Sequence, residues 1–272
     1  MELETDLPTY GRPPLVEVAA DMQFTSLPLK AVDIGAFHAL IAAEYPYTLD
    51  VPPLMPSFET FGPGNVGHFG ISVGTGLLPR SWFISADDEH VIQLQTDRLI
   101  VNWRMRAPDG GAYPRYPEVR QRFVAAHEAL TTLVHRQGYP NVVPNQCDLT
   151  YINKVPLPDG AEIGDLHRLL RGIQLGAAPE WGAPFDEFNV LLRREVQNQN
   201  QGALAKLQIA CSSIQIDLTQ FAWALNVTVK GRPAAANVAA VLDFFDIAHV
   251  EIVRAFGSIT TEAMHEYWEI QR

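Results

Sequence analysis

The feature that most constrains the fold is an order of predicted elements that occurs twice along the chain. Each half is predicted to hold a strand, a helix, three strands and a second helix. Period-two alternation of apolar residues indicates the strands, and helical spacing indicates the helices. Two sequence traces support a duplication. Phe123–His127 and Phe245–His249 share Phe-x-x-Ala-His in the two long helices, and Pro28-Leu29 and Pro156-Leu157 end the first strand of each half.

We therefore predict an α+β fold, in which two similar halves form one continuous antiparallel sheet with the helices on one face. Residues 1–11 are predicted to be a disordered leader, residues 12–140 the first half and residues 141–272 the second half. Neither half can cover its sheet alone, so we expect both to unfold as one cooperative unit.

The predicted elements follow these patterns along the chain. A strand over 16–24 precedes a helix that Asp33 is placed to cap, and a helix follows Pro117. Residues 46–80 are predicted to be loop, with one short strand near Phe69–Val73. The remaining predicted elements are strands over 81–85, 90–95, 98–104, 146–155, 187–196, 203–212 and 221–230, a helix over 165–173, and a helix after Pro233.

The register of the hairpin over 90–103 follows from the side-chain period, since a slip of one residue would mix two distinct sets. Pairing across Thr96-Asp97 gathers one apolar set: Ile92, Leu94, Leu99, Val101 and Trp103. The opposite face then carries Gln93, Gln95, Arg98, Asn102 and Arg104, and pairing with 81–85 adds Trp82 to it while Phe83 joins the apolar side.

The second half alternates in the same way, and it places Gln208, Asn226 and Lys206 on the polar side. A face of Gln, Asn and Arg with a Trp is either a solvated sheet face or a recognition surface, because Trp and Arg are enriched at binding hot spots. The binding residues predicted on this face are Trp82, Gln93, Gln95, Arg98, Asn102, Arg104, Gln208 and Asn226.

Composition restricts the partners of this chain. The 272 residues carry a formal net charge of −11, which argues against nucleic acid and anionic membranes because either requires a basic face. No run approaches the roughly 18 apolar residues that span a bilayer, and the acidic start does not resemble a signal peptide. Cys147 and Cys211 are too few for a disulfide framework or a zinc site. We expect a cytoplasmic protein with buried thiols.

Motifs for catalysis or cofactors are weak. Gly62–Gly67 matches GxGxxG, but an alternating segment rather than a helix follows it, so no nucleotide site is expected. His127 and His249 are interpreted as helix-packing residues, with Asp246 placed to raise the pKa of His249. Glu17, Asp21 and Asp148 are candidate acid–base groups, although surface charge pairs are commoner. No metal site and no cofactor are predicted.

Several motifs together resemble a sporadically distributed prokaryotic family of about this length with no established function. They are Ser81–Ser85, Gln93–Arg98, Val101–Arg104, Tyr113–Tyr116, Pro144–Cys147, Thr150–Asn153, and Ala248-His249 with Phe256 and Ile259-Thr260. The resemblance runs from about residue 11 to the end. It implies mobile or defence-associated gene cassettes and supplies no catalytic residue. Alternation directs Tyr151 and Asn153 towards the helices.

Three functions remain open from the sequence. The first is a non-catalytic binding protein, an acidic partner subunit of a toxin–antitoxin, immunity or defence cassette that recognises a basic protein through the polar face. The second is a small-molecule sensor or hydrolase-like enzyme with its site in the same curved face. The third is a homodimer that buries this face against a second copy.

Overall fold

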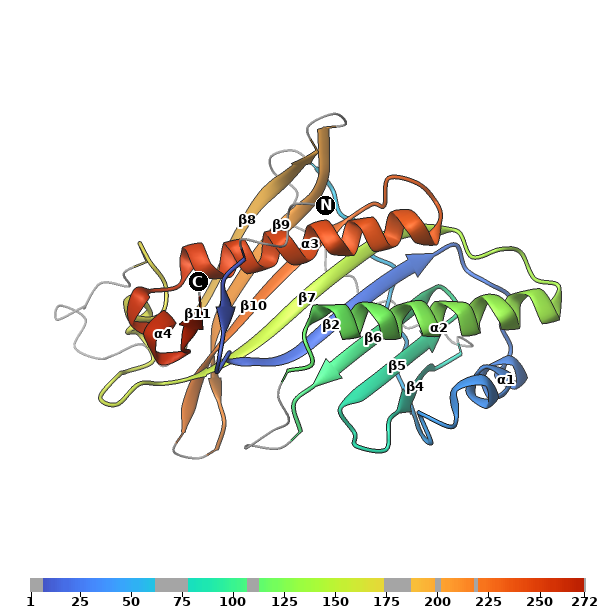
Figure 1. Cartoon of the computed structure of the whole chain (residues 1–272), viewed down its shortest axis with the longest axis horizontal. Helices are drawn as coiled ribbons and strands as arrows, with labels where there is room; N and C mark the ends of the chain where they lie inside the picture. Colours follow the sequence, from blue (N-terminus) through green and yellow to red (C-terminus); the bar gives the residue numbers. More distant parts are fainter. Residues whose placement is uncertain are drawn as a thin grey trace.

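The computed structural model describes residues 7–61, 78–106, 113–173, 187–198, 202–217 and 220–271. A nine-stranded antiparallel sheet has the strand order β3-β4-β5-β6-β2-β7-β10-β9-β8 (Figure 1). Its strands are β2 (Leu15–Phe24), β3 (Tyr47–Val51), β4 (Arg80–Ile84), β5 (His90–Gln95), β6 (Arg98–Arg104), β7 (Pro144–Pro156), β8 (Asn189–Asn198), β9 (Gly202–Gln215) and β10 (Phe221–Gly231). The predicted α+β class with one continuous antiparallel sheet is confirmed.

The two halves place their strands in the same order. From the centre outward, β2 is followed by β6, β5 and β4, and β7 is followed by β10, β9 and β8. The halves meet where β2 pairs antiparallel with β7, and Asp21 lies directly opposite Asp148. A single apolar core includes side chains from both halves. This shared core favours the cooperative unfolding that we expect.

Three helices cover one face of the sheet: α1 (Ala31–Ile41), α2 (Tyr116–Gln137) and α3 (Val238–Ile259) (Figure 1). α2 has Pro117 in its first turn, where a missing N–H costs nothing, and it ends at Gly138 with φ 66°. Its predicted apolar positions are all buried, namely Val119, Phe123, Ala126, Leu130, Leu133 and Val134. No helix in the described part of the chain is long and apolar enough to cross a bilayer.

The predicted register of the first half is confirmed. Leu94 pairs with Leu99 and Gln95 with Arg98, so the hairpin turns at Thr96-Asp97. β4 pairs with β5 so that Trp82 lies opposite Gln93. The apolar set enters the core beneath the helices, and the polar set occupies the opposite face.

The helix predicted over 165–173 is wrong. The chain forms only one 3₁₀ turn there, Leu166–Arg168, and Gly172 adopts φ 72°, which ends regular structure. Leu166, Leu169 and Leu170 are nevertheless buried. The 3₁₀ turn and a β-bridge from Leu170 to Thr260 bury these leucines without a helix. The apolar spacing therefore predicted burial correctly but the wrong type of element.

Residues 7–11 differ from the predicted disordered leader. β1 (Thr9–Tyr10) pairs with β11 (Ile270–Gln271), which follows a short helix, α4 (Glu262–Tyr267). Tyr10 is buried with its ring edge-on to Phe256 and Trp268. This aromatic packing orders a segment whose sequence has no periodicity of its own.

Two further expectations need correction. Lys30, not Asp33, is the N-cap of α1, and Asp33 at the third helical position accepts a hydrogen bond from the Lys30 N–H at 2.8 Å. β3 lies in the predicted loop, because an exposed edge strand shows little burial pattern. The strand predicted near Phe69–Val73 and the GxGxxG motif at 62–67 lie outside the described residues.

Candidate functional site

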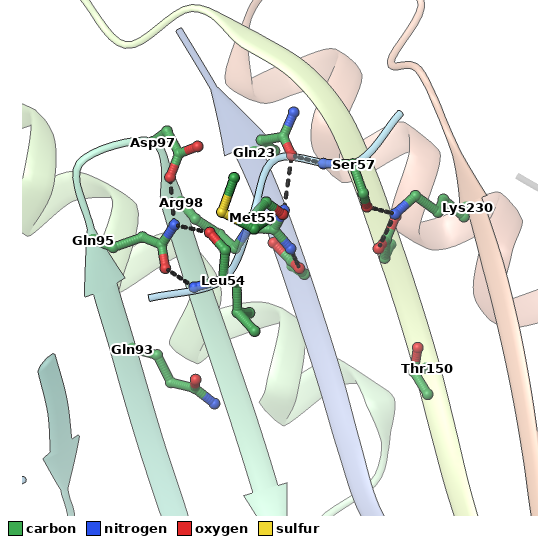
Figure 2. A network of polar contacts seen from close by, with 12 residues as sticks. Gln23, Leu54, Met55, Ser57, Gln93, Gln95, Asp97, Arg98, Thr150 and Lys230 are labelled. Atoms are coloured by element: carbon green, nitrogen blue, oxygen red, sulfur yellow. Dashed lines mark hydrogen bonds and ion pairs between the residues drawn. The ribbon is translucent and has the colours of Figure 1, made fainter. Parts of the chain in front are cut away.

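A segment of the chain itself crosses the polar face of the sheet. Residues 52–61, here called the crossing segment, follow β3 and pass over β5, β6, β2 and β7 in turn (Figure 2). Gln95 on β5 accepts from the Leu54 N–H and donates to the Leu54 carbonyl, both at 2.9 Å. On β6, Arg98 donates to the Met55 carbonyl at 3.4 Å. Two residues predicted to bind a partner therefore bind the chain's own backbone.

The second part of the crossing segment continues this pattern. The Ser57 N–H donates to Gln23 on β2 at 3.0 Å, and the Glu59 N–H donates to Gln146 on β7 at 3.4 Å. Lys230 on β10 reaches the Ser57 hydroxyl, as Figure 2 shows. Pro52, Pro53 and Pro56 have no N–H, so they cannot donate backbone hydrogen bonds. The glutamines of the sheet accept instead from the N–H groups of Leu54, Ser57 and Glu59.

A cluster of four charges lies beneath the crossing segment at the centre of the sheet. Asp21 accepts from Arg98 at 2.7 Å, and Asp148, directly across β2–β7, accepts from Lys230 at 3.1 Å. Burial raises the pKa of Asp21 to about 7 and also raises the pKa of Asp148. The structure thus brings two predicted acid–base residues together, but each faces a cation in a covered and balanced cluster.

The other predicted residues form separate contacts nearer the opposite ends of these strands. Gln93 donates to Asn102 at 2.7 Å, and Asn102 donates to the third acid–base candidate, Glu17, at 2.6 Å. The Arg104 guanidinium lies 5.7 Å from the centre of the Trp82 ring and is paired with Asp88.

In the second half, Gln208 and Asn226 lie on the polar face, as their strand positions predicted. Gln208 accepts from Arg193 at 3.1 Å. Asn226 is half-buried, and within the described residues its side-chain oxygen has no hydrogen-bond partner.

Replacing Gln95 tests whether these contacts hold the crossing segment. Gln95→Leu is expected to lower the free energy of unfolding by about 1–3 kcal/mol, because the Leu54 N–H loses its acceptor in a partly buried position. Faster hydrogen exchange at the Leu54 and Ser57 amides, compared with the β5 amides, would show local release of the segment. Gln208→Leu is the matched control, since Gln208 lies on the same face and its side chain contacts Arg193 on β8. Equal exchange in both variants would contradict the assignment.

A cavity of about 550 Å³ opens on the helix-covered side of the sheet. It lies between α3, the start of α2, β1 and the adjoining parts of β2 and β7. Apolar and aromatic side chains dominate its wall, which is typical of small-molecule sites of this size. The residues lining it are Leu7, Pro8, Thr9, Tyr10, Pro13, Leu15, Tyr113, Arg115, Tyr116, Pro117, Tyr151, Asn153, His249, Ile252, Val253 and Phe256.

A short hydrogen-bond chain forms part of the cavity wall. Tyr113 donates to the Tyr151 hydroxyl at 3.2 Å, and Tyr151 lies 2.7 Å from Nδ1 of His249. The His249 ring stacks on Tyr116 with centroids 4.2 Å apart. Burial lowers the pKa of His249 to about 4, so the imidazole is neutral at neutral pH. With Nδ1 accepting from Tyr151, Nε2 carries the proton and can donate.

Asp246 does not have the role that the sequence suggested. It accepts from the Tyr116 hydroxyl at 2.6 Å and from Arg120 at 2.8 Å, rather than pairing with His249. Desolvation outweighs its charge, so the pKa of His249 falls instead of rising.

Sequence reasoning missed the cavity as a site. Alternation directs Tyr151 and Asn153 towards the helices without giving them a role, and His249 is interpreted as a helix-packing residue. The residue types could have indicated a site. Tyrosine and histidine at inward positions bring polar groups into the interior, and such groups require hydrogen-bond partners there. Tyr113 and Tyr116 add two more such groups.

Metal and thiol chemistry have little support in this region. No group of three His, Cys, Asp or Glu side chains among the described residues could hold a metal ion. Cys147 and Cys211 are free and buried, and burial raises the pKa of both thiols. Neither lines the cavity.

Comparison with models of known protein families gives no match, and no curated protein matches the chain in sequence. The family resemblance of the hairpin motifs therefore stays a prediction, and the function is argued from the geometry alone.

Proposed function

We propose that this chain is a non-catalytic binding protein that holds a small, largely apolar ligand in the cavity between α2, α3 and the sheet. The observation that carries the proposal is a 550 Å³ space lined by five aromatic rings and by few polar groups, led by the Tyr151–His249 pair. Such walls bury most of a ligand's surface while a few polar groups orient it. The two free, buried thiols fit a reducing compartment, and a cytoplasmic location remains part of this proposal.

Filling the cavity should remove the ligand. Val253→Trp places an indole in the cavity from α3, and the chain purified from its native host is expected to lose a small-molecule mass that the unaltered chain carries. Native mass spectrometry followed by denaturation measures this mass. Ile247→Trp is the control, because Ile247 lies on the same helix at 36% exposure and does not line the cavity.

Two results would contradict the proposal. One is an unaltered chain that carries no added mass in native spectra. The other is a mass that Val253→Trp retains while its circular dichroism shows a folded chain.

A protein partner is the second candidate, and it would dock on the crossing segment instead of on the sheet residues beneath it. In this segment the side chains of Met55, Phe58 and Phe61 are 42%, 52% and 38% exposed. Clustered exposed apolar side chains are typical of interaction sites. An acidic chain would attract a basic partner, as in a toxin–antitoxin, immunity or defence cassette. A second polypeptide in the native spectra that Phe58→Ser releases would favour this candidate.

A further inference from the structure

The charge around the cavity is opposite to the charge of the chain. The sequence holds 31 acidic and 20 basic residues, yet none of the described residues that line the cavity is Asp or Glu. Arg115 is the one Lys or Arg among the described lining residues, and His249 is neutral there at neutral pH. Asp246, a nearby carboxylate behind Tyr116, is neutralised by Arg120. Among the described lining residues, an anionic group at the rim would meet the Arg115 cation and no carboxylate.

Arg115 is held at the rim by the cavity wall itself. Its guanidinium lies 6.0 Å from the centre of the Tyr113 ring and donates weakly to the Tyr10 carbonyl at 3.5 Å. No acidic side chain pairs with it in the part of the chain that the structure describes. The side chain is exposed, so the guanidinium can reach a ligand that enters from solvent.

The backbone at Arg115 is also unusual. Its φ of 75° lies in the left-handed region, which costs a residue with a side chain about 1 kcal/mol or more. Such strain clusters at functional positions. Arg115 is also the N-cap of α2 and supplies no side-chain cap, so the positive end of a 22-residue helix begins beside it. The N-terminal end of the helix favours an anion at this point.

The rest of the cavity wall indicates the chemistry of the uncharged part of the ligand. The rings of Tyr10, Tyr113, Tyr116, Tyr151 and Phe256 line the cavity. Aromatic rings pack well edge-on or offset against another planar ring.

We infer that the ligand is an aromatic carboxylate, with its ring among these tyrosines and its carboxylate paired with Arg115. This inference rests on the function proposed above and names the ligand class. The planar guanidinium suits a carboxylate because it can donate two parallel hydrogen bonds.

Two probes of nearly the same shape, one anionic and one neutral, test the ligand class. The probes are 2-naphthoate and its neutral amide, 2-naphthamide, each titrated into the whole chain by calorimetry. We expect the carboxylate to bind at least about tenfold more tightly than the amide. Arg115→Gln should weaken binding of the carboxylate by at least about tenfold and leave binding of the amide unchanged. Arg136→Gln, a cation in the last turn of α2 far along the helix, should change neither affinity.

The outcomes separate this inference from the proposed function. Equal affinities for the two probes, no effect of Arg115→Gln, or no binding of either probe would each overturn the aromatic carboxylate. The cavity itself would still be judged by the mass that Val253→Trp removes. If Val253→Trp removes no mass and also leaves naphthoate binding intact, both proposals fail together.

Discussion

Arg98→Met is expected to lower the free energy of unfolding by about 3–5 kcal/mol at about pH 8.5, as breaking a buried ion pair does. Arg98 is 6% exposed and donates to Asp21 at 2.7 Å and to Gln23 at 2.7 Å. Without it, the Asp21 carboxylate has no cation of its own and lies directly opposite a second carboxylate, Asp148. Urea denaturation of the variant and the unaltered chain, monitored by tryptophan fluorescence, measures the difference.

The loss of unfolding free energy caused by Arg98→Met should become smaller as the pH falls. Burial raises the pKa of Asp21 to about 7, so near pH 5.5 its carboxyl group carries a proton in both proteins and needs no cation. Arg98→Met combined with Asp21→Leu should recover most of the stability, because an apolar pair can replace a buried ion pair. Arg193→Met, at an exposed arginine on β8, should change stability by less than about 0.5 kcal/mol. A double variant no more stable than Arg98→Met alone would show that the Asp21 charge is not the cause.

Side-chain period was sufficient to predict the sheet apart from its exposed edge strand, β3. A strand has two faces, so the position of Leu94 fixes that of Gln93, and one pairing of Leu94 with Leu99 fixes the hairpin. The second half has the same order of elements, so the same alternation predicts its two faces. For this reason the side-chain period assigns both the polar face and the apolar face correctly.

The use of the polar face could not be predicted in this way. The crossing segment has no periodicity, and its contacts join residues far apart in the chain, such as Leu54 with Gln95 and Glu59 with Gln146. Nothing in the local sequence of either partner specifies the other. A row of glutamines that can meet backbone N–H groups is equally suited to a partner's backbone or to the chain's own, and only the three-dimensional path decides between them.

The cavity was hidden for a related reason. Its wall combines residues near positions 10, 115, 151 and 250, which approach each other only after β1, α2, β7 and α3 have packed. Helical and strand periods predict that Tyr151 and His249 point inward, but a period cannot distinguish a filled core from a hollow one. The hydrogen-bonded polar tips of these two residues are a chemical signal that periodicity does not evaluate.

His249→Phe is expected to change how stability depends on pH. Burial lowers the pKa of His249 from an ordinary 6.5 to about 4, so between these values the unfolded chain binds this proton and the folded chain does not. The contribution of His249 to folding stability is therefore full above pH 6.5 and is lost as the pH falls towards 4. Asp21 acts in the opposite sense: its raised pKa means that folding stability falls as the pH rises from about 4 to about 7.

The effects of His249 and Asp21 on the pH dependence of stability therefore oppose each other in the unaltered chain between about pH 4 and 6.5. Replacing His249 leaves the effect of Asp21 unopposed. The stability difference between the unaltered chain and His249→Phe should grow by about 3 kcal/mol in favour of the unaltered chain as the pH rises across this range. His90 and His127, whose pKa values are also lowered by burial, are present in both proteins and cancel in the difference. Tyr151→Phe is the control, since it removes the hydroxyl that contacts Nδ1 but keeps the buried imidazole, so it should preserve the pH dependence. A pH-independent difference for His249→Phe, measured by urea denaturation at several pH values, would mean that the imidazole is solvated and that the cavity wall around it is open to water.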